Sequence, residues 1–166
     1  MDAEKLFVTG DSAGAQLAVY TALIQTSPAL QALYQVRPAP VTIRALGLIS
    51  GMFETKKGSI KHLRKLFYGE DFMQSEIYKN MDYATVPGLE ALPPCYLATS
   101  AEDGLRGATL DFAAILSERG VEHALHDWPK QKGKKLPHVF SILFPLWEES
   151  RQTSAEMTEF FQKHGA

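Results

Sequence analysis

Short apolar runs recur along the chain and are separated by longer segments of mixed character. The runs Leu6–Thr9, Ile43–Ile49 and Cys95–Thr99 are mostly apolar. A later run, Glu122–Trp128, alternates in part between apolar and polar residues. Runs of this length beside turn residues are typical of β-strands, and continuously apolar ones are typical of strands buried on both faces. The pattern predicts four strands.

Helical segments separate these runs. The segment from about Ala13 to Gln25 is apolar nearly all round, which predicts a deeply buried helix. Leu30–Pro40 reads as a linker with a short helical piece, and Gly107–Arg119 has one apolar face before the stop signal Gly120. Pro145 suits the first turn of a final helix. One face of that helix is expected to carry Leu146, Ser150, Thr153, Met157, Phe160 and Phe161.

The segment Phe53–Leu92 differs in character, because it mixes basic residues with aromatic ones. We expect short helices lying over a strand end, as a lid-like insertion outside the sheet. The alternatives are a solvated helix face for its charges and ordinary packing for its aromatics. The chain has 166 residues, which predicts a single domain over residues 1–166.

Strands that alternate with helices predict the α/β class, with a mostly parallel sheet flanked by helices and right-handed crossovers. In such sheets, functional residues gather on loops at the carboxyl ends of the strands. Candidate functional residues are therefore expected on those loops.

Composition narrows the possible functions. The residues are 45% apolar and 22% charged, with a net charge of −2, which is ordinary for a globular protein and gives no general attraction to nucleic acid or anionic membranes. No apolar run approaches the length of a membrane span. The amino-terminal residues lack the layout of a secretory signal. The single cysteine, Cys95, suits a reducing compartment and is expected to be a buried structural thiol, so we expect a cytoplasmic protein.

One loop, Pro129–Pro137, carries lysines at positions 130, 132, 134 and 135. Nucleic-acid binding by this loop is one reading. A solvated turn is favoured, because the overall charge is slightly negative. The sequence shows no metal-ligand cluster, phosphate-binding glycine loop or cofactor motif, so no cofactor is expected.

The segment Gly10–Gly14 reads G-D-S-A-G and joins the first apolar run to the first helical segment. G-x-S-x-G between a strand and a helix is the pattern of a nucleophile elbow, a sharp turn that brings the residues on either side of the serine close together. Glycines there avoid a clash and tolerate strained backbone angles. We expect Ser12 to be a nucleophile and the Ala13 N–H to stabilise a developing oxyanion. The alternative is that Ser12 only caps the helix.

A serine nucleophile needs a base, and the base needs an acid to orient it. With this elbow the chain order is serine, acid, histidine, and Ser12, Asp103 and His138 occur in that order after predicted strands. Asp103 is otherwise a turn or helix-cap residue, and His138 an exposed loop histidine. Glu102 is a weaker candidate acid. Of the five histidines, only His138 lies on the loop after the last strand.

These motifs resemble the alpha/beta-hydrolase superfamily, and within it the hormone-sensitive-lipase-like esterases. Gly10–Gly14 matches that family's elbow. Asp103–Arg106, D-G-L-R, is similar to its D-P-L-R acid motif, and His138–Phe140, H-V-F, is similar to its H-G-F histidine motif. The resemblance implies a carboxylic-ester hydrolase that forms an acyl-enzyme on Ser12 and acts on small acyl esters.

The family's His-Gly-Gly-Gly oxyanion motif, which precedes the elbow, does not occur in this sequence. The chain therefore resembles the carboxyl-terminal half of such an enzyme. Two expectations follow from this. The first is an alternative function: the chain would be a catalytically impaired hydrolase-fold fragment that acts as a binding or structural domain. In addition, the apolar strand Leu6–Thr9 is expected to have an open edge through which the chain self-associates.

Overall fold

The computed structural model describes residues 5–53, 74–79 and 82–165. Within these residues the centre is a four-stranded sheet in the order β1-β2-β3-β4. The strands are β1 Leu6–Asp11, β2 Ile43–Ile49, β3 Cys95–Ser100 and β4 His123–Trp128. All pairs of neighbouring strands are parallel, which confirms the predicted parallel sheet.

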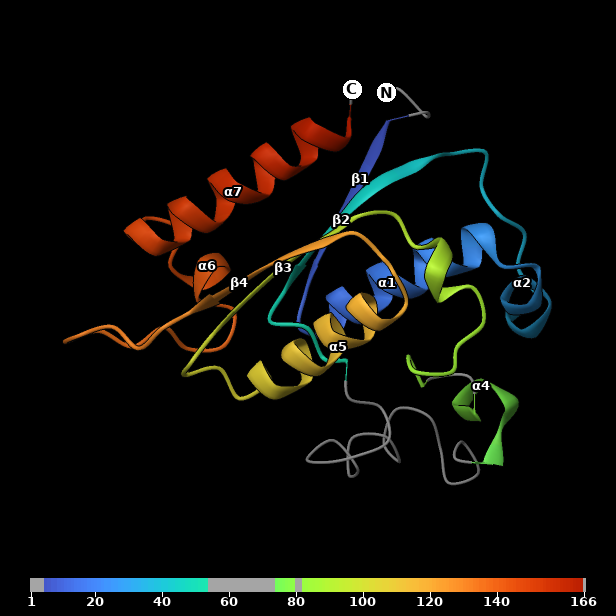
Figure 1. Ribbon diagram of the computed structural model, residues 1–166, viewed down its shortest axis with the longest axis horizontal. Coiled ribbons are helices and arrows are strands. Elements are labelled where there is room, and N and C mark those ends of the chain that lie inside the picture. Colours follow the sequence, from blue (N-terminus) through green and yellow to red (C-terminus); the bar gives the residue numbers. More distant parts are fainter. Residues whose placement is uncertain (1–4, 54–73, 80–81, 166) are drawn as a thin grey trace.

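Helices cover both faces of this sheet. Helices α1 and α5 lie on one face, and α7 lies on the other (Figure 1). The described helices are α1 Ala13–Thr26, α2 Pro28–Tyr34, α4 Glu76–Lys79, the 3₁₀ turn η2 Leu89–Ala91, α5 Arg106–Glu118, α6 Phe140–Leu143 and α7 Glu148–His164. The described residues thus form an α/β fold with helices on both faces of a parallel sheet.

The two inner strands show why their sequences are continuously apolar. In β2, Leu46 and Leu48 pack against α1 and α5, whereas Ile49 faces α7. In β3, Leu97 faces the first pair of helices and Tyr96 faces α7. Successive residues of a strand point to opposite faces, so a sheet covered on both sides requires apolar residues at every position.

The prediction that α1 is deeply buried is correct for only one side of the helix. Ala15, Val19 and Leu23 are fully buried against the sheet, but Leu17 is 67% exposed. The physical reason is that α1 packs on β1, which is an edge strand paired only with β2 in the described residues. The helix α1 therefore carries apolar side chains that the described fold leaves exposed.

The final helix begins later than its proline indicated. Helix α7 starts at Glu148 and not at Pro145, and Leu146 is 78% exposed and not part of the buried face. The short helix α6, which the sequence did not predict, comes first, and the rings of Phe144 and Trp147 stack at 4.1 Å in the turn between the two helices. This turn occupies the residues that were expected to open α7.

Part of the predicted insertion lies outside the described residues, namely residues 54–73 and 80–81. Its described ends belong to the main core. Phe53 and Tyr83 are buried, and both contact the ring of Phe112 on α5, with centroids 4.1 and 4.8 Å away. For these two aromatics the ordinary packing interpretation holds. The lid-like insertion and the single domain stay predictions.

Two further expectations concern membrane-spanning segments and the single cysteine. Among the described residues, no helix is both long and apolar enough to cross a membrane. Cys95 is buried at the start of β3, and burial raises the pKa of its thiol to about 12. The predicted burial of this thiol is confirmed.

Candidate active site

Ser12 occupies a strained turn between β1 and α1. Its backbone has φ 51° and ψ −120°, a conformation that costs a non-glycine residue about 1–3 kcal/mol. The turn is held from β2, because the Ser12 N–H donates to the Ile49 carbonyl at 2.9 Å and the Ser12 carbonyl accepts from the Met52 N–H at 3.0 Å. The Ser12 hydroxyl makes no capping hydrogen bond to α1, so the helix-cap interpretation is wrong for this side chain.

The two glycines of the elbow have different roles. A Cβ atom on Gly10 would lie 2.2 Å from the Gly14 carbonyl oxygen and 2.7 Å from the Ala15 nitrogen, so the turn excludes any side chain there. A Cβ atom on Gly14 would meet nothing within 4 Å. The expectation that both glycines avoid a clash is therefore correct for Gly10 and wrong for Gly14, because the crowding involves the backbone of residue 14 and not its side-chain direction.

His138 lies between the other two predicted site residues. Its Nε2 atom is 3.0 Å from Ser12 Oγ, and its Nδ1 atom is 2.9 Å from Asp103 Oδ1. A carboxylate only accepts hydrogen bonds, so Nδ1 carries the proton and Nε2 is left to accept from the serine hydroxyl. The Asp103 side chain is 1% exposed and that of His138 is 38% exposed, which leaves one side of the ring open. The structure thus brings together three residues that are far apart in sequence.

Asp103 is oriented by its own turn. Its Oδ1 accepts the Leu105 N–H at 2.8 Å, and its Oδ2 accepts the Thr99 hydroxyl at 3.3 Å. The turn-aspartate interpretation is therefore also correct, since one carboxylate serves the turn and the histidine. The alternative acid, Glu102, accepts the Leu136 N–H at 3.0 Å. It is Asp103, and not Glu102, that contacts His138.

The remaining histidines of the described residues are engaged elsewhere. His123 Nδ1 lies 2.9 Å from a backbone carbonyl, and His126 Nδ1 lies 2.5 Å from a glutamate of α7. His164 Nε2 lies 3.5 Å from a glutamate beside β4. His62 falls outside the described residues. Among the described histidines, then, it is His138 that contacts Ser12.

Ala13 is the first residue of α1. The first N–H groups of a helix have no carbonyl partner within it, and they carry the positive end of the helix dipole. Ala13 follows Ser12 directly, so its N–H is the candidate donor to the oxyanion that forms on the carbonyl oxygen of an ester when Ser12 Oγ attacks it. Its role as an oxyanion donor stays a prediction.

Sequence reasoning missed an ion pair that braces the acid turn. Arg106, the last residue of the D-G-L-R motif, donates to Asp127 through Nε at 2.9 Å and Nη2 at 2.6 Å. The hydrogen bonds and charge of Asp127 raise the pKa of the arginine. The pair ties the start of α5, three residues after Asp103, to the end of β4. The arginine in the motif was the available signal, but its partner lies 21 residues further on.

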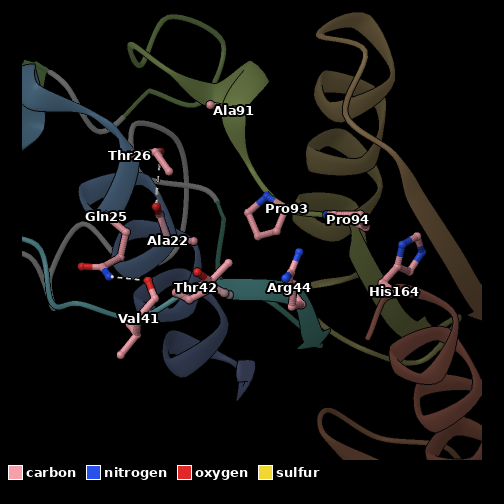
Figure 2. Close-up of a pocket in the computed structure, with 11 residues that line it drawn as sticks. Ala22, Gln25, Thr26, Val41, Thr42, Arg44, Ala91, Pro93, Pro94 and His164 are labelled. Carbon is pink, nitrogen blue, oxygen red and sulfur yellow. Dashed lines mark hydrogen bonds between the residues drawn. The ribbon is translucent and has the colours of Figure 1, made fainter. Parts of the chain in front are cut away.

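A pocket of about 510 Å³ lies at the opposite end of the sheet, near the end of α1 and the start of β2. Figure 2 shows the Gln25 side-chain amide donating to the Val41 carbonyl at 3.5 Å and the Thr26 hydroxyl donating to the Ala22 carbonyl at 3.5 Å. None of the three predicted site residues lines this pocket. Within the described residues, no three His, Cys, Asp or Glu side chains are grouped as a metal site requires.

A parallel sheet with a strand–serine–helix turn, and with aspartate and histidine on later strand ends, defines the alpha/beta-hydrolase class. The profile of the family described as alpha/beta hydrolase fold matches residues 1–141, and the chain belongs to this family. The expected fold class and the resemblance to hormone-sensitive-lipase-like esterases are both confirmed.

Solved esterase structures are similar to nearly the whole chain. Esterase B from Lactobacillus rhamnosis has 26% identity and a TM-score of 0.85, and the match covers 99% of this chain and 54% of that one. The same esterase inhibited by a tributyrin phosphonate has 27% identity and a TM-score of 0.84, again covering 99% and 54%. The Pyrobaculum calidifontis esterase, at 20% identity and a TM-score of 0.60, shares the fold over 100% of this chain and 55% of its own.

The chain therefore spans about half the length of these solved esterases. Comparison with curated protein sequences gives no match.

Proposed function

We propose that this chain carries the acid, base and nucleophile of a serine carboxylic-ester hydrolase acting on small acyl esters. The observation that supports the proposal most is the pair of contacts from His138, to Ser12 Oγ at 3.0 Å and to Asp103 Oδ1 at 2.9 Å. Hydroxyl, imidazole and buried carboxylate in this order form a proton-transfer unit, and the half-buried serine is its reacting end.

The proposed reaction has two stages. Ser12 Oγ attacks the acyl carbon while its proton moves to His138 Nε2, and the oxyanion faces the Ala13 N–H. The bond to the alcohol then breaks as His138 returns the proton to the leaving oxygen. In the second stage a water molecule gives a proton to His138 as its oxygen attacks the acyl carbon of the acyl-enzyme. The bond from that carbon to Ser12 Oγ then breaks, the acid leaves, and His138 returns the proton to Ser12 Oγ. Asp103 holds the ring throughout and stabilises its positive form.

The choice of small acyl esters rests on similarity. Esterase B, at 27% identity, has been solved inhibited by a tributyrin phosphonate. We propose acyl groups of similar size for this chain, and a cytoplasmic location consistent with one buried, reduced cysteine.

Labelling with a fluorophosphonate tests this function. The serine oxygen bonds to phosphorus, fluoride leaves, and the serine proton passes to the base, so labelling requires an activated serine. We expect one label, located on Ser12 by peptide mass spectrometry, and none in Ser12→Ala. A folded chain that does not label would contradict the proposal and favour the alternative, a hydrolase-fold domain with a binding or structural role.

We also propose that the chain associates with itself along the open edge of β1. Unpaired edges with apolar side chains promote pairing between chains. Phe7 is 37% exposed on β1, and Leu17 is 67% exposed on the adjacent helix. Burying such surface contributes about 25 cal/mol per Å².

Light scattering across a concentration series is expected to show a mass above that of the monomer, and Leu17→Glu is expected to shift the distribution towards monomer. Leu146→Glu is the matched control, because Leu146 is 78% exposed but lies in the turn between α6 and α7. A single monomeric species at high concentration, with normal thermal stability, would refute self-association.

A further inference from the structure

The loop that carries His138 is bonded on both sides to strand ends that the proposed mechanism does not use. On one side, the Val139 N–H donates to Ser50 Oγ at 3.2 Å. On the other side, Leu136 uses both of its backbone groups. Its carbonyl accepts the Ser100 hydroxyl at 2.5 Å, and its N–H donates to Glu102 Oε2 at 3.0 Å.

These bonds come from rigid and buried positions. Ser50 follows β2 and Ser100 ends β3, and each is 1% exposed. The Ser50 N–H donates to the Ala98 carbonyl at 2.8 Å, and the Ser100 hydroxyl also accepts the Glu102 N–H at 3.3 Å. The hydroxyls are therefore fixed to the same sheet that positions Ser12.

The loop needs such support because its backbone is strained. Val139 has φ 51° and ψ 32°, the left-handed conformation, which is a clear outlier for a β-branched residue. Conformations of this kind persist only where the surroundings impose them. The apolar neighbours Leu136 and Phe140 are each 1% exposed and pack with Trp128, which seats the loop but does not set the rotation of its peptide groups.

We propose that Ser50, Ser100 and Glu102 are positioning residues that hold His138 between the nucleophile and the acid, an inference that rests on the proposed function. They act through the backbone at residues 136 and 139 and touch neither substrate nor the reacting atoms. The role of Glu102 is thus to accept the Leu136 N–H, and it differs from that of the acid, Asp103.

The test compares fluorophosphonate labelling rates of Ser50→Ala, Ser100→Ala and Glu102→Ala with the wild-type chain. Misplacing a catalytic group by about 1 Å can cost on the order of 100-fold in rate, and the loss of one of three anchors is expected to lower the maximal labelling rate about 10-fold. The probe concentration giving half that rate should not change, because the anchors do not contact the probe. Thermal melts verify that each variant is folded.

Two matched variants separate positioning from general damage. Glu102→Gln keeps an oxygen acceptor for the Leu136 N–H and is expected to label at close to the wild-type rate, whereas an acid of the triad would not tolerate the change. Ser150→Ala removes another 1% exposed serine, whose hydroxyl has no hydrogen-bond partner among the described residues. It is expected to label like the wild type.

Amide hydrogen exchange measures how well the backbone N–H groups of the loop are held, and it does not depend on activity. Exchange at Val139 should accelerate in Ser50→Ala, and exchange at Leu136 should accelerate in Glu102→Ala. Labelling rates that fall no further than in Ser150→Ala, or exchange that does not change, would overturn the inference. A wild-type chain that fails to label contradicts the proposed function instead, and the anchoring is then decided by exchange alone.

Discussion

Ser12→Ala is expected to abolish ester hydrolysis, with kcat/KM for a nitrophenyl butyrate falling roughly 10⁴- to 10⁶-fold, to the background rate. The reason is that Ser12 Oγ is the atom 3.0 Å from His138 Nε2, and without it no acyl-enzyme forms. His138→Ala is expected to cause a similar loss, because the members of such a unit act together. Initial rates measured by nitrophenolate absorbance decide both.

An exposed serine of α7 provides the control for this prediction. Ser154→Ala should hydrolyse the ester at the wild-type rate, because the side chain is exposed to solvent on α7. Since the prediction compares variants with one another, it holds even where the absolute rate of the chain is low. Hydrolysis by Ser12→Ala at the rate of Ser154→Ala would exclude the mechanism.

Gly10→Ala is expected to destabilise the fold by about 3 kcal/mol or more, because the added methyl group overlaps backbone atoms that cannot move independently of α1. The clash is at 2.2 Å with the Gly14 carbonyl oxygen and 2.4 Å with its carbonyl carbon. Relieving it requires the strand and the helix to separate at the nucleophile. Thermal and urea unfolding measure the loss.

Gly14→Ala is the matched comparison for that substitution. The same methyl group meets nothing within 4 Å at this position, and alanine is favoured over glycine within a helix by roughly 1 kcal/mol. The variant should be as stable as the wild type or slightly more stable. Equal stability of Gly10→Ala and the wild type would show that the turn is less crowded than the structure indicates.

The strands were the part of the fold that could be predicted most closely. Ile43–Ile49 was predicted at its observed bounds, and Cys95–Thr99 fell one residue short of β3. Burial on both faces imposes a continuous apolar run, and this local signal does not depend on knowing which helix covers which face. The parallel arrangement followed from the alternation of strands and helices.

Elements without such a signal were missed. Helix α6, Phe140–Leu143, is too short to show a helical period, and its presence moved the start of α7 from Pro145 to Glu148. The exposure of Leu17 could not be predicted either, because an apolar side chain does not reveal whether anything packs on its far side.

The candidate site was also predicted only in part. The order of Ser12, Asp103 and His138, each in a segment that follows a strand, was sufficient to expect their convergence, because the carboxyl ends of parallel strands lie at the same edge of the sheet. The sequence favoured Asp103 over Glu102, but the contact of Asp103 with His138 depends on the direction of each side chain, which a local pattern does not specify. Their catalytic roles stay a proposal.

The sequence by itself determined the class of fold and the chemistry available at the strand ends, because burial patterns and the strand–glycine–serine–helix turn are local properties of the chain. Only the tertiary structure decided which groups meet. The contacts of His138 with Ser12, of Ser50 with Val139 and of Arg106 with Asp127 join residues 126, 89 and 21 positions apart. Such contacts depend on the register of the sheet and the path of each loop, which no local pattern specifies.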